Sequence, residues 1–213
     1  MRIFCAEIEK LTKEVYEEKK HLLAEERIER IERFRHEGDK RRSFGAGLLL
    51  EYGLRLYGYT QRELFLKKNE AGKYQVPPAL GLYFNLSHSG DRVVAAFDEQ
   101  EIGIDVERQR ETKLQVARRF FTEEEYRLIR QQNSREKQEK MFTRIWTRKE
   151  SYVKAIGLGL RIDLRSFDTI ADELGQTGYF FHTYEEKDSY IISGCAKNRN
   201  FPGKIEYVDL RCV

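Results

Sequence analysis

The sequence has few of the residues that cross-link small secreted domains. It contains three cysteines and three prolines in 213 residues, and no two cysteines form a C-x-x-C pair. A scattered, odd set of cysteines argues against a disulfide framework or a cysteine zinc site and indicates reduced thiols. No apolar run approaches the ~20 residues of a membrane span, and no secretory-signal pattern opens the chain. We therefore expect a soluble protein of the cytoplasm.

Neither sign of charge is in excess. The chain has 39 Lys and Arg against 36 Asp and Glu, a net charge of +3, which does not favour bulk nucleic-acid binding. The basic segment 27–42 leaves nucleic-acid binding open as an alternative function. It also holds Glu29, Glu32 and Glu37, which is typical of a solvated mixed-charge helix. With 40% hydrophobic residues, the chain can bury a sizeable core.

Apolar periodicity predicts groups of helices and strands. Helices are expected over 12–36, over 40–57 with Asp39 as N-cap and Gly58 after it, from a capping box at Thr122, and over 141–156 before Gly157. Strands are expected at 1–8, 63–68, 82–86, 92–98, 102–107, 167–170, 179–184, 189–196 and 205–210. This succession indicates an α+β fold, with residues 1–100 as one half and 101–213 as the other.

Two carboxylates share one face of an otherwise apolar strand, EIGIDVERQ at 101–109. Side chains alternate along a strand, so the apolar residues 102, 104 and 106 point one way and Gly103, Asp105 and Glu107 the other. Burying both carboxylates unpaired would cost several kcal/mol each. We expect a cation between them.

The segment WTRKESYVKA at 146–155 reads as a helix. Trp146, Glu150 and Lys154 recur at i, i+4 and i+8 and therefore lie along one stripe. Taken alone, Glu150 and Lys154 fit equally well an exposed helix pair worth ~0.3–0.5 kcal/mol.

The segment FNLSHSG at 84–90 ends a strand in small polar residues that can approach a phosphate closely. A lone histidine such as His88 is more often a hydrogen-bonded structural residue than a catalyst. Nothing marks Ser87 or Ser89 as a nucleophile on a strained turn.

Together, the three segments indicate magnesium-assisted transfer at a pyrophosphate. Asp105, Glu107 and Glu150 would supply the hard oxygen ligands that Mg²⁺ prefers. Cations for a polyphosphate would come from the basic residues Arg42, His88 and Lys154. No histidine and cysteine set has zinc spacing, and no G-x-x-x-x-G-K-[ST] loop is present.

In this order, FNLSHSG, GIDVE and WTRKESYVKA resemble the motifs of the 4′-phosphopantetheinyl transferases, in the larger, surfactin-synthetase-activating (Sfp-type) branch. RRFFTEEEY at 118–126 resembles the segment between the last two motifs. The trimeric carrier-protein synthases of the same superfamily are little more than half as long. The resemblance implies a monomer of two similar α+β halves, related by a pseudo-two-fold, with the active site in the cleft between them.

The resemblance also implies the reaction. With Mg²⁺, the 4′-phosphopantetheine arm of coenzyme A is transferred to a serine of an apo acyl or peptidyl carrier protein, and adenosine 3′,5′-bisphosphate is released. Fatty-acid, polyketide and nonribosomal-peptide carriers all stay open. The alternative is a non-catalytic module that binds coenzyme A or a nucleotide, which predicts loss of one acid or the helix lysine; all four are present. Neither nucleic acid nor a membrane is an expected partner.

Individual roles follow from the same resemblance. Asp105, Glu107 and Glu150 match the magnesium ligands, and Glu150 is also the favoured general base. Lys154 and His88 join Glu150 as catalytic residues. The residues that match contacts with coenzyme A are Arg27, Arg30, Arg42, Ser43, Lys73, Ser87, His88 and Lys154. Where family members often have G-K-P, this chain has G-K-Y at 72–74.

A docking face for an acidic carrier is expected over 113–130, where arginines such as Arg118 and Arg119 alternate with apolar residues such as Phe121 and Ile129. The same pattern fits equally well a pair of amphipathic helices whose apolar residues face the core.

Overall fold

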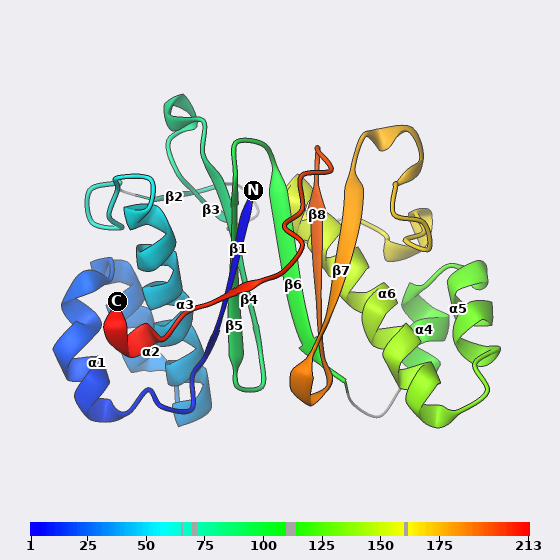
Figure 1. Ribbon diagram of the computed structural model, residues 1–213, viewed down its shortest axis with the longest axis horizontal. Helices are drawn as coiled ribbons and strands as arrows, with labels where there is room; N and C mark the ends of the chain where they lie inside the picture. Colours follow the sequence, from blue (N-terminus) through cyan, green and yellow to red (C-terminus); the bar gives the residue numbers. More distant parts are fainter. Residues whose placement is uncertain (65, 70–71, 110–113, 160–161) are drawn as a thin grey trace. The chain divides into compact units, whose positions relative to one another are not determined.

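A computed structural model gives the structure of residues 1–64, 66–69, 72–109, 114–159 and 162–213. Phe65, in a predicted strand, and Lys113, the first residue of the expected docking face, lie outside these ranges. The described residues form two compact units, Met1–Glu99 with Pro202–Val213 and Gln100–Phe201 (Figure 1). Each unit combines helices with a largely antiparallel sheet, which confirms the α+β class. Within the described ranges, no helix is both long and apolar enough to cross a bilayer.

The first unit is built on a four-stranded sheet in the order β4-β5-β1-β9. Its strands are β1 (Arg2–Glu7), β4 (Tyr83–Ser89), β5 (Arg92–Asp98) and β9 (Glu206–Tyr207). Neighbours are antiparallel except β9, which runs parallel to β1. A separate hairpin pairs β2 (Lys67–Lys68) with β3 (Tyr74–Gln75).

Helix α3 (Glu37–Arg55) covers one face of this sheet, and α1 (Lys13–Lys19) and α2 (Glu25–Arg33) lie on the side of α3 away from it (Figure 1). Residues 43–50 of α3 are all buried, as expected of a helix covered on both sides. Short 3-10 helices lie at Lys20–Leu22, Pro78–Leu80 and Leu210–Cys212.

The second unit is a three-stranded antiparallel sheet in the order β6-β8-β7. Its elements are β6 (Ile102–Arg108), α4 (Leu114–Phe120), α5 (Glu123–Arg130), α6 (Arg135–Ile156), β7 (Phe180–Glu186) and β8 (Tyr190–Ala196). Helix α6 packs on β6 and β8, and α5 packs on α6 (Figure 1). Single 3-10 turns lie at Leu164–Ser166, Gly175–Thr177 and Lys187–Ser189.

Helix α6 approaches β6 very closely at Gly103. A Cβ atom at this position would lie 1.9 Å from the Ser151 carbonyl oxygen and 2.5 Å from the Ala155 nitrogen. Only a residue without a side chain allows the two backbones to meet in this way. The glycine of GIDVE therefore sets the depth at which α6 lies on the sheet.

Most predicted elements are confirmed. The Thr122 capping box is complete: Thr122 Oγ1 accepts from the Glu125 N–H at 3.2 Å, and the Glu125 carboxylate accepts from the Thr122 N–H at 2.9 Å. Gly157 ends α6 with a φ of 69°, in the left-handed region. The helix begins earlier than predicted, because Ser134 caps its N-terminus by accepting from the Lys137 N–H.

The predicted N-cap of α3 was wrong. His36 is the N-cap, and the helix begins at Glu37. Asp39 lies instead in the first turn, where Oδ1 accepts a hydrogen bond from Arg42 at 2.6 Å. A carboxylate in the first turn still suits the positive end of the helix dipole. The strand predicted over 63–68 is reduced to Lys67–Lys68.

The strand predicted over 167–170 is absent from the structure, and its backbone groups have other partners. The Phe167 carbonyl accepts from Lys149 Nζ at 2.6 Å, and the Thr169 N–H donates to the Glu125 carboxylate at 2.8 Å. Because these groups bind buried charges, they cannot also form a β-ladder.

The end of the chain belongs to the first unit, not to the second half as predicted. The strand predicted over 205–210 shortens to β9, after which the Val208 N–H donates to the Cys5 carbonyl at 2.9 Å. Leu210 is buried in the core of this unit, and Lys19 Nζ donates to the Val213 carbonyl oxygen at 3.1 Å. Apolar burial and pairing with β1 therefore determine where this segment lies.

Replacing Gly103 with alanine should lower the free energy of unfolding by about 1–3 kcal/mol, because the new methyl group overlaps the backbone of α6. Urea unfolding followed by fluorescence of Trp146, the single tryptophan, measures this. The control is Gly203→Ala, where a Cβ meets nothing within 4 Å; it should change stability by less than about 0.5 kcal/mol. Equal stability of the two variants would mean that α6 can move off β6 without cost.

Candidate functional site

Strand β6 and helix α6 bring Asp105 and Lys154 into direct contact. Asp105 is only 4% exposed, and Lys154 Nζ donates to its Oδ1 at 2.6 Å and to the Ile104 carbonyl at 3.3 Å. The two residues are 49 positions apart in the chain. Lys154 thus reaches β6. The alternative in which Lys154 forms only an exposed helix pair with Glu150 is therefore wrong. The cation that the sequence requires beside Asp105 is, in this structure, the Lys154 ammonium group.

The predicted face of β6 is confirmed. Gly103 and Asp105 lie on the side covered by α6, and Asp105 stands opposite Ser193 on β8. Thr147 Oγ1 of α6 is 2.8 Å from Ser193 Oγ, so polar groups of the helix and of two strands meet here. This face is a buried polar layer between helix and sheet.

Glu150 is half-buried on α6, one turn before Lys154. Burial raises the pKa of Glu150, and the Asp105 and Glu107 carboxylates raise it further, while Lys154 opposes them. Nearby charges shift a pKa in this way over short distances. The three predicted acids therefore share one neighbourhood in the second unit.

The acids suit a magnesium ion by their chemistry. Asp105, Glu107 and Glu150 offer carboxylate oxygens, the ligands that this hard cation prefers, and one of them already binds a cationic group. In the described ranges, no three acidic, histidine or cysteine side chains are arranged closely enough to hold an ion. The donor set therefore fits magnesium by its chemistry.

A buried ion pair beside this site was missed by the sequence analysis. Lys149 and Glu125 have side chains of 0% exposure, and Lys149 Nζ lies 2.9 Å from a Glu125 carboxylate oxygen. Lys149 also donates to the Leu164 and Phe167 carbonyls, at 2.7 and 2.6 Å. Burial lowers the pKa of Lys149, although the Glu125 carboxylate opposes this. The pair connects α5, α6 and the chain that follows α6.

A sequence signal for this pair existed. Ile145, Lys149 and Val153 recur at i, i+4 and i+8, and both apolar members are buried. A lysine in the middle of a buried stripe requires a buried acid. Glu125 closes the capping box, and its carboxylate also accepts from Thr169 Oγ1 at 3.0 Å; nothing in the spacing of the two motifs pairs it with Lys149.

In the first unit, α2 and α3 bring two predicted arginines to one serine. Arg30 Nη2 donates to Ser43 Oγ at 3.3 Å, and Arg27 Nη1 donates to the Ser43 carbonyl at 3.4 Å. Burial, with the nearby Arg30 guanidinium, lowers the pKa of Arg27 to about 10. Arg27 therefore stays charged at neutral pH, and the group favours an anion.

Arg42 joins α3 to the turn that follows FNLSHSG. Its Nη1 donates to the Gly90 carbonyl at 3.3 Å, and its Nη2 donates to Asp39 at 2.6 Å. The hydrogen bond from Arg42 is the main cause of a lowered pKa at Asp39, to which His36 and His88 add. His88 is exposed, and its effect on the pKa of Asp39 puts it near this second basic group of the first unit.

Two further predicted residues of the first unit are Ser87, on β4, and Lys73, just before β3. Ser87 is buried in β4, opposite Val94. Lys73 precedes β3, and its backbone N–H donates to Asn69 Oδ1 at 2.9 Å. The next residue, Tyr74, lines a cavity of about 960 Å³ together with Arg27. A contact between Lys73 and a nucleotide stays a prediction.

Comparisons with known proteins place the chain among the 4′-phosphopantetheinyl transferases. A sequence model of the 4′-phosphopantetheinyl transferase superfamily matches residues 101–199. The chain is 31% identical to the 4′-phosphopantetheinyl transferase Sfp of Bacillus subtilis, over 93% of this chain and 92% of that protein. It is 30% identical to the 4′-phosphopantetheinyl transferase psf-1 of Bacillus pumilus, over 99% and 94%. A shorter stretch, 40% of this chain, is 37% identical to the L-aminoadipate-semialdehyde dehydrogenase-phosphopantetheinyl transferase of Xenopus laevis, and covers 31% of it.

Replacing Lys149 with alanine should lower the free energy of unfolding by about 3–5 kcal/mol, because Glu125 would be left as a buried charge without its cation. Urea unfolding measures the loss. The matched control is Lys140→Ala, which removes the half-exposed pair with Glu185 and should cost less than about 1 kcal/mol. If both lysines contribute equally, the buried pair does not hold this part of the unit together.

Proposed function

The chain belongs to the 4′-phosphopantetheinyl transferase superfamily, and we propose that its reaction depends on Mg²⁺ and on Glu150, Lys154 and His88. It is a phosphopantetheinyl transferase, an enzyme that modifies a carrier protein with the arm of coenzyme A. The observation that carries the proposal is the 2.6 Å contact between Lys154 and Asp105, with Glu150 one turn away. This contact joins two of the three motifs that carry the resemblance, and half-buried Glu150 lies among the charged groups of Asp105, Glu107 and Lys154.

We propose that Glu150 is the general base. The serine hydroxyl of the carrier attacks the phosphorus of the pantetheine-side phosphate, a P–O bond forms, and the bond to the departing bisphosphate breaks. The hydroxyl proton passes to the Glu150 carboxylate. A raised pKa brings a carboxylate closer to neutral pH, where a general base is most effective.

Lys154 has two roles in the proposal. At rest its ammonium group offsets the Asp105 carboxylate. During transfer, the same group stabilises negative charge that builds on the leaving bisphosphate. Asp105, Glu107 and Glu150 would hold the magnesium ion, which when bound would offset the charge of the pyrophosphate and polarise its phosphorus.

The basic groups of the first unit are the proposed contacts with coenzyme A. Arg30 with Ser43 Oγ offers donors to a phosphate, and Arg42 with His88 offers a second cationic group. Arg27 lines the neighbouring cavity, which is large enough for a nucleotide base. Lys73 and Ser87 are further proposed contacts.

The carrier protein is proposed to dock on α4 and α5. Arg118 and Arg119 are exposed there and suit an acidic partner. Phe121 and Ile129, expected on the same face, are buried in the core of the second unit. The apolar centre of a docking face must therefore come from other residues, such as Leu114, which is 36% exposed.

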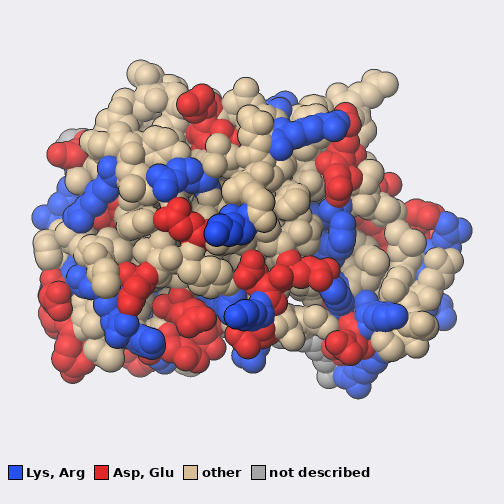
Figure 2. Space-filling model, in the orientation of Figure 1, with Lys and Arg blue, Asp and Glu red and all other residues tan. Residues whose placement is uncertain are grey.

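Other partners and the compartment follow from charge and cysteines. Basic and acidic side chains are interspersed on the face shown in Figure 2, so we do not propose nucleic acid as a partner. The three cysteines are free, and we propose the cytoplasm as the compartment, because thiols stay reduced there. We propose that the enzyme acts as a monomer.

The direct test incubates the protein with coenzyme A, Mg²⁺ and apo carrier proteins from fatty-acid, polyketide and nonribosomal-peptide systems. Mass spectrometry should show the arm attached to the carrier serine. A carrier in which that serine is alanine is the control and should stay unmodified. Tight binding of coenzyme A without modification of any carrier would support the non-catalytic alternative.

The metal part of the proposal predicts that Asp105→Asn abolishes transfer, because a carboxylate ligand is lost. EDTA should stop the wild-type enzyme, and added Mg²⁺ should restore it. The control, Glu99→Gln, removes an exposed carboxylate that is not a proposed magnesium ligand and should leave activity unchanged. Full turnover in EDTA would contradict the magnesium proposal.

For Lys154, turnover and stability can be separated. Lys154→Met should lower kcat by about 10², the scale of losing one preorganised donor. It should also cost about 1–3 kcal/mol of stability, because buried Asp105 loses its cation. In Lys154→Met/Asp105→Asn, stability should return while transfer stays lost. Recovery of turnover in the double variant would limit Lys154 to a structural role.

A further inference from the structure

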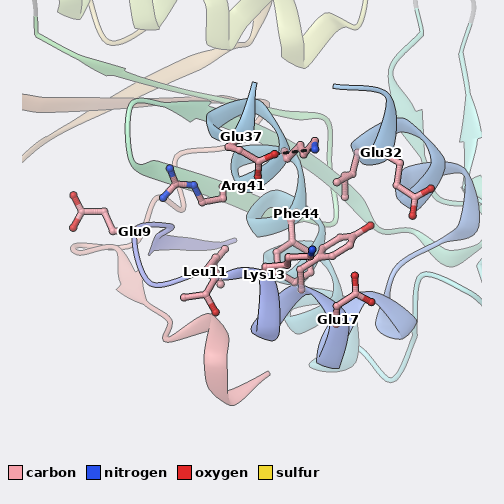
Figure 3. Close-up of a pocket in the computed structure, with 12 residues that line it drawn as sticks. Glu9, Leu11, Lys13, Glu17, Glu32, Glu37, Arg41 and Phe44 are labelled. Atoms are coloured by element: carbon pink, nitrogen blue, oxygen red, sulfur yellow. Dashed lines mark hydrogen bonds and ion pairs between the residues drawn. The ribbon is translucent and has the colours of Figure 1, made fainter. Parts of the chain in front are cut away.

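A cavity of about 600 Å³ lies entirely within the first unit, among α1, α2 and α3 (Figure 3). Its volume is in the range of small-molecule sites in proteins. None of the residues that line it has been assigned a role above. The cavity is therefore separate from the residues proposed for the transferase reaction.

The inner wall of the cavity is apolar. Leu11, Ile31 and Phe44 line it and are at most 3% exposed. The ring of Tyr16 meets the ring of Phe44 edge to face, with centroids 5.0 Å apart. A wall of this kind favours the flat apolar body of an aromatic group.

One polar atom in this wall lacks a partner. The Tyr16 hydroxyl oxygen is buried and makes no hydrogen bond within the described ranges. Burial, and then the Glu32 carboxylate, raise the pKa of Tyr16, so the hydroxyl keeps its proton. It can donate that proton to an acceptor on a bound molecule, which would remove the cost of leaving it unsatisfied.

The rim carries charges of both signs. Glu37 pairs with Lys40 at 2.8 Å, and Glu17 pairs with Lys20 at 2.5 Å. The rim residues that form no ion pair within the described part of the chain are Lys13, Arg41, Glu9 and Glu32. Figure 3 shows Arg41 and Glu9 on one side of Phe44 and Glu32 on the other.

We propose that this cavity binds a small zwitterion with an aromatic side chain, such as a free aromatic amino acid. The ring lies against the apolar wall, the carboxylate accepts from Tyr16 and pairs with Lys13 or Arg41, and the ammonium group pairs with Glu32 or Glu9. A ligand with a single charge would face at least two rim charges of its own sign. The proposal is independent of the transferase reaction.

Calorimetric titration of the whole protein tests the ligand class. L-phenylalanine should bind saturably, with a Kd of about 1 mM or below. Phenethylamine lacks the carboxylate and 3-phenylpropionate lacks the ammonium group; each should bind at least tenfold more weakly. Saturating coenzyme A should leave the phenylalanine affinity unchanged. Equal binding of all three compounds, displacement by coenzyme A, or no saturable binding of phenylalanine would overturn the proposal.

Three substitutions, each conservative or at an exposed residue, test whether phenylalanine binds in this cavity. Tyr16→Phe removes only the hydroxyl, and Glu32→Gln and Arg41→Gln each remove one rim charge; each should raise the Kd for phenylalanine at least fivefold. The charge-matched controls are Glu123→Gln on α5 and Arg33→Gln on α2, exposed residues that do not line the cavity. Their Kd should match that of the wild type. Unchanged affinity in all three cavity variants would place any binding elsewhere and reject this site.

Discussion

The second unit depends on the close approach of α6 to β6 at Gly103. This approach places the carbonyl of Ser151 and the nitrogen of Ala155 where a side chain would otherwise stand. One turn along the helix and one pleat along the strand, the same packing brings Lys154 within 2.6 Å of Asp105. The stripe of Glu150 and Lys154 on α6 is thus held over Asp105 on β6 by backbone contact. A larger residue at position 103 would separate the two motifs.

Helix α6 also stabilises the chain that follows it by burying cations. Lys149 binds Glu125 and two carbonyls, while Arg148 donates to the carbonyls of Thr169, Ile170 and Ala171 at 3.0 to 3.2 Å. Buried ion pairs add little net stability over apolar packing, but removing one partner is costly. Here they satisfy backbone groups that no strand satisfies. Carbonyl groups within residues 164–171 are thus held by buried charged side chains and not by strand pairing.

In the first unit, charge is organised around the N-terminal turns of α3. Arg42 and Ser43 are consecutive, yet Arg42 reaches the turn after β4 while Ser43 receives Arg30 from α2. Consecutive residues on a helix point about 100° apart, so one turn of α3 contacts both α2 and the turn after β4. Two basic groups thereby come to the same end of one helix, where its dipole also favours an anion.

What the sequence by itself determined was local: the alternation that puts Asp105 and Glu107 on one face of β6, the capping box at Thr122, and the stripe of Glu150 and Lys154. Period and capping are properties of neighbouring residues, so a single sequence contains them. The motifs also sufficed to identify the family. Tertiary structure alone decided the partners of distant groups. Lys154 meets Asp105 across 49 residues, Lys149 meets Glu125, and residues 202–213 return to β1. These pairings depend on which surfaces can be buried together, and a local sequence pattern does not specify which distant surfaces meet.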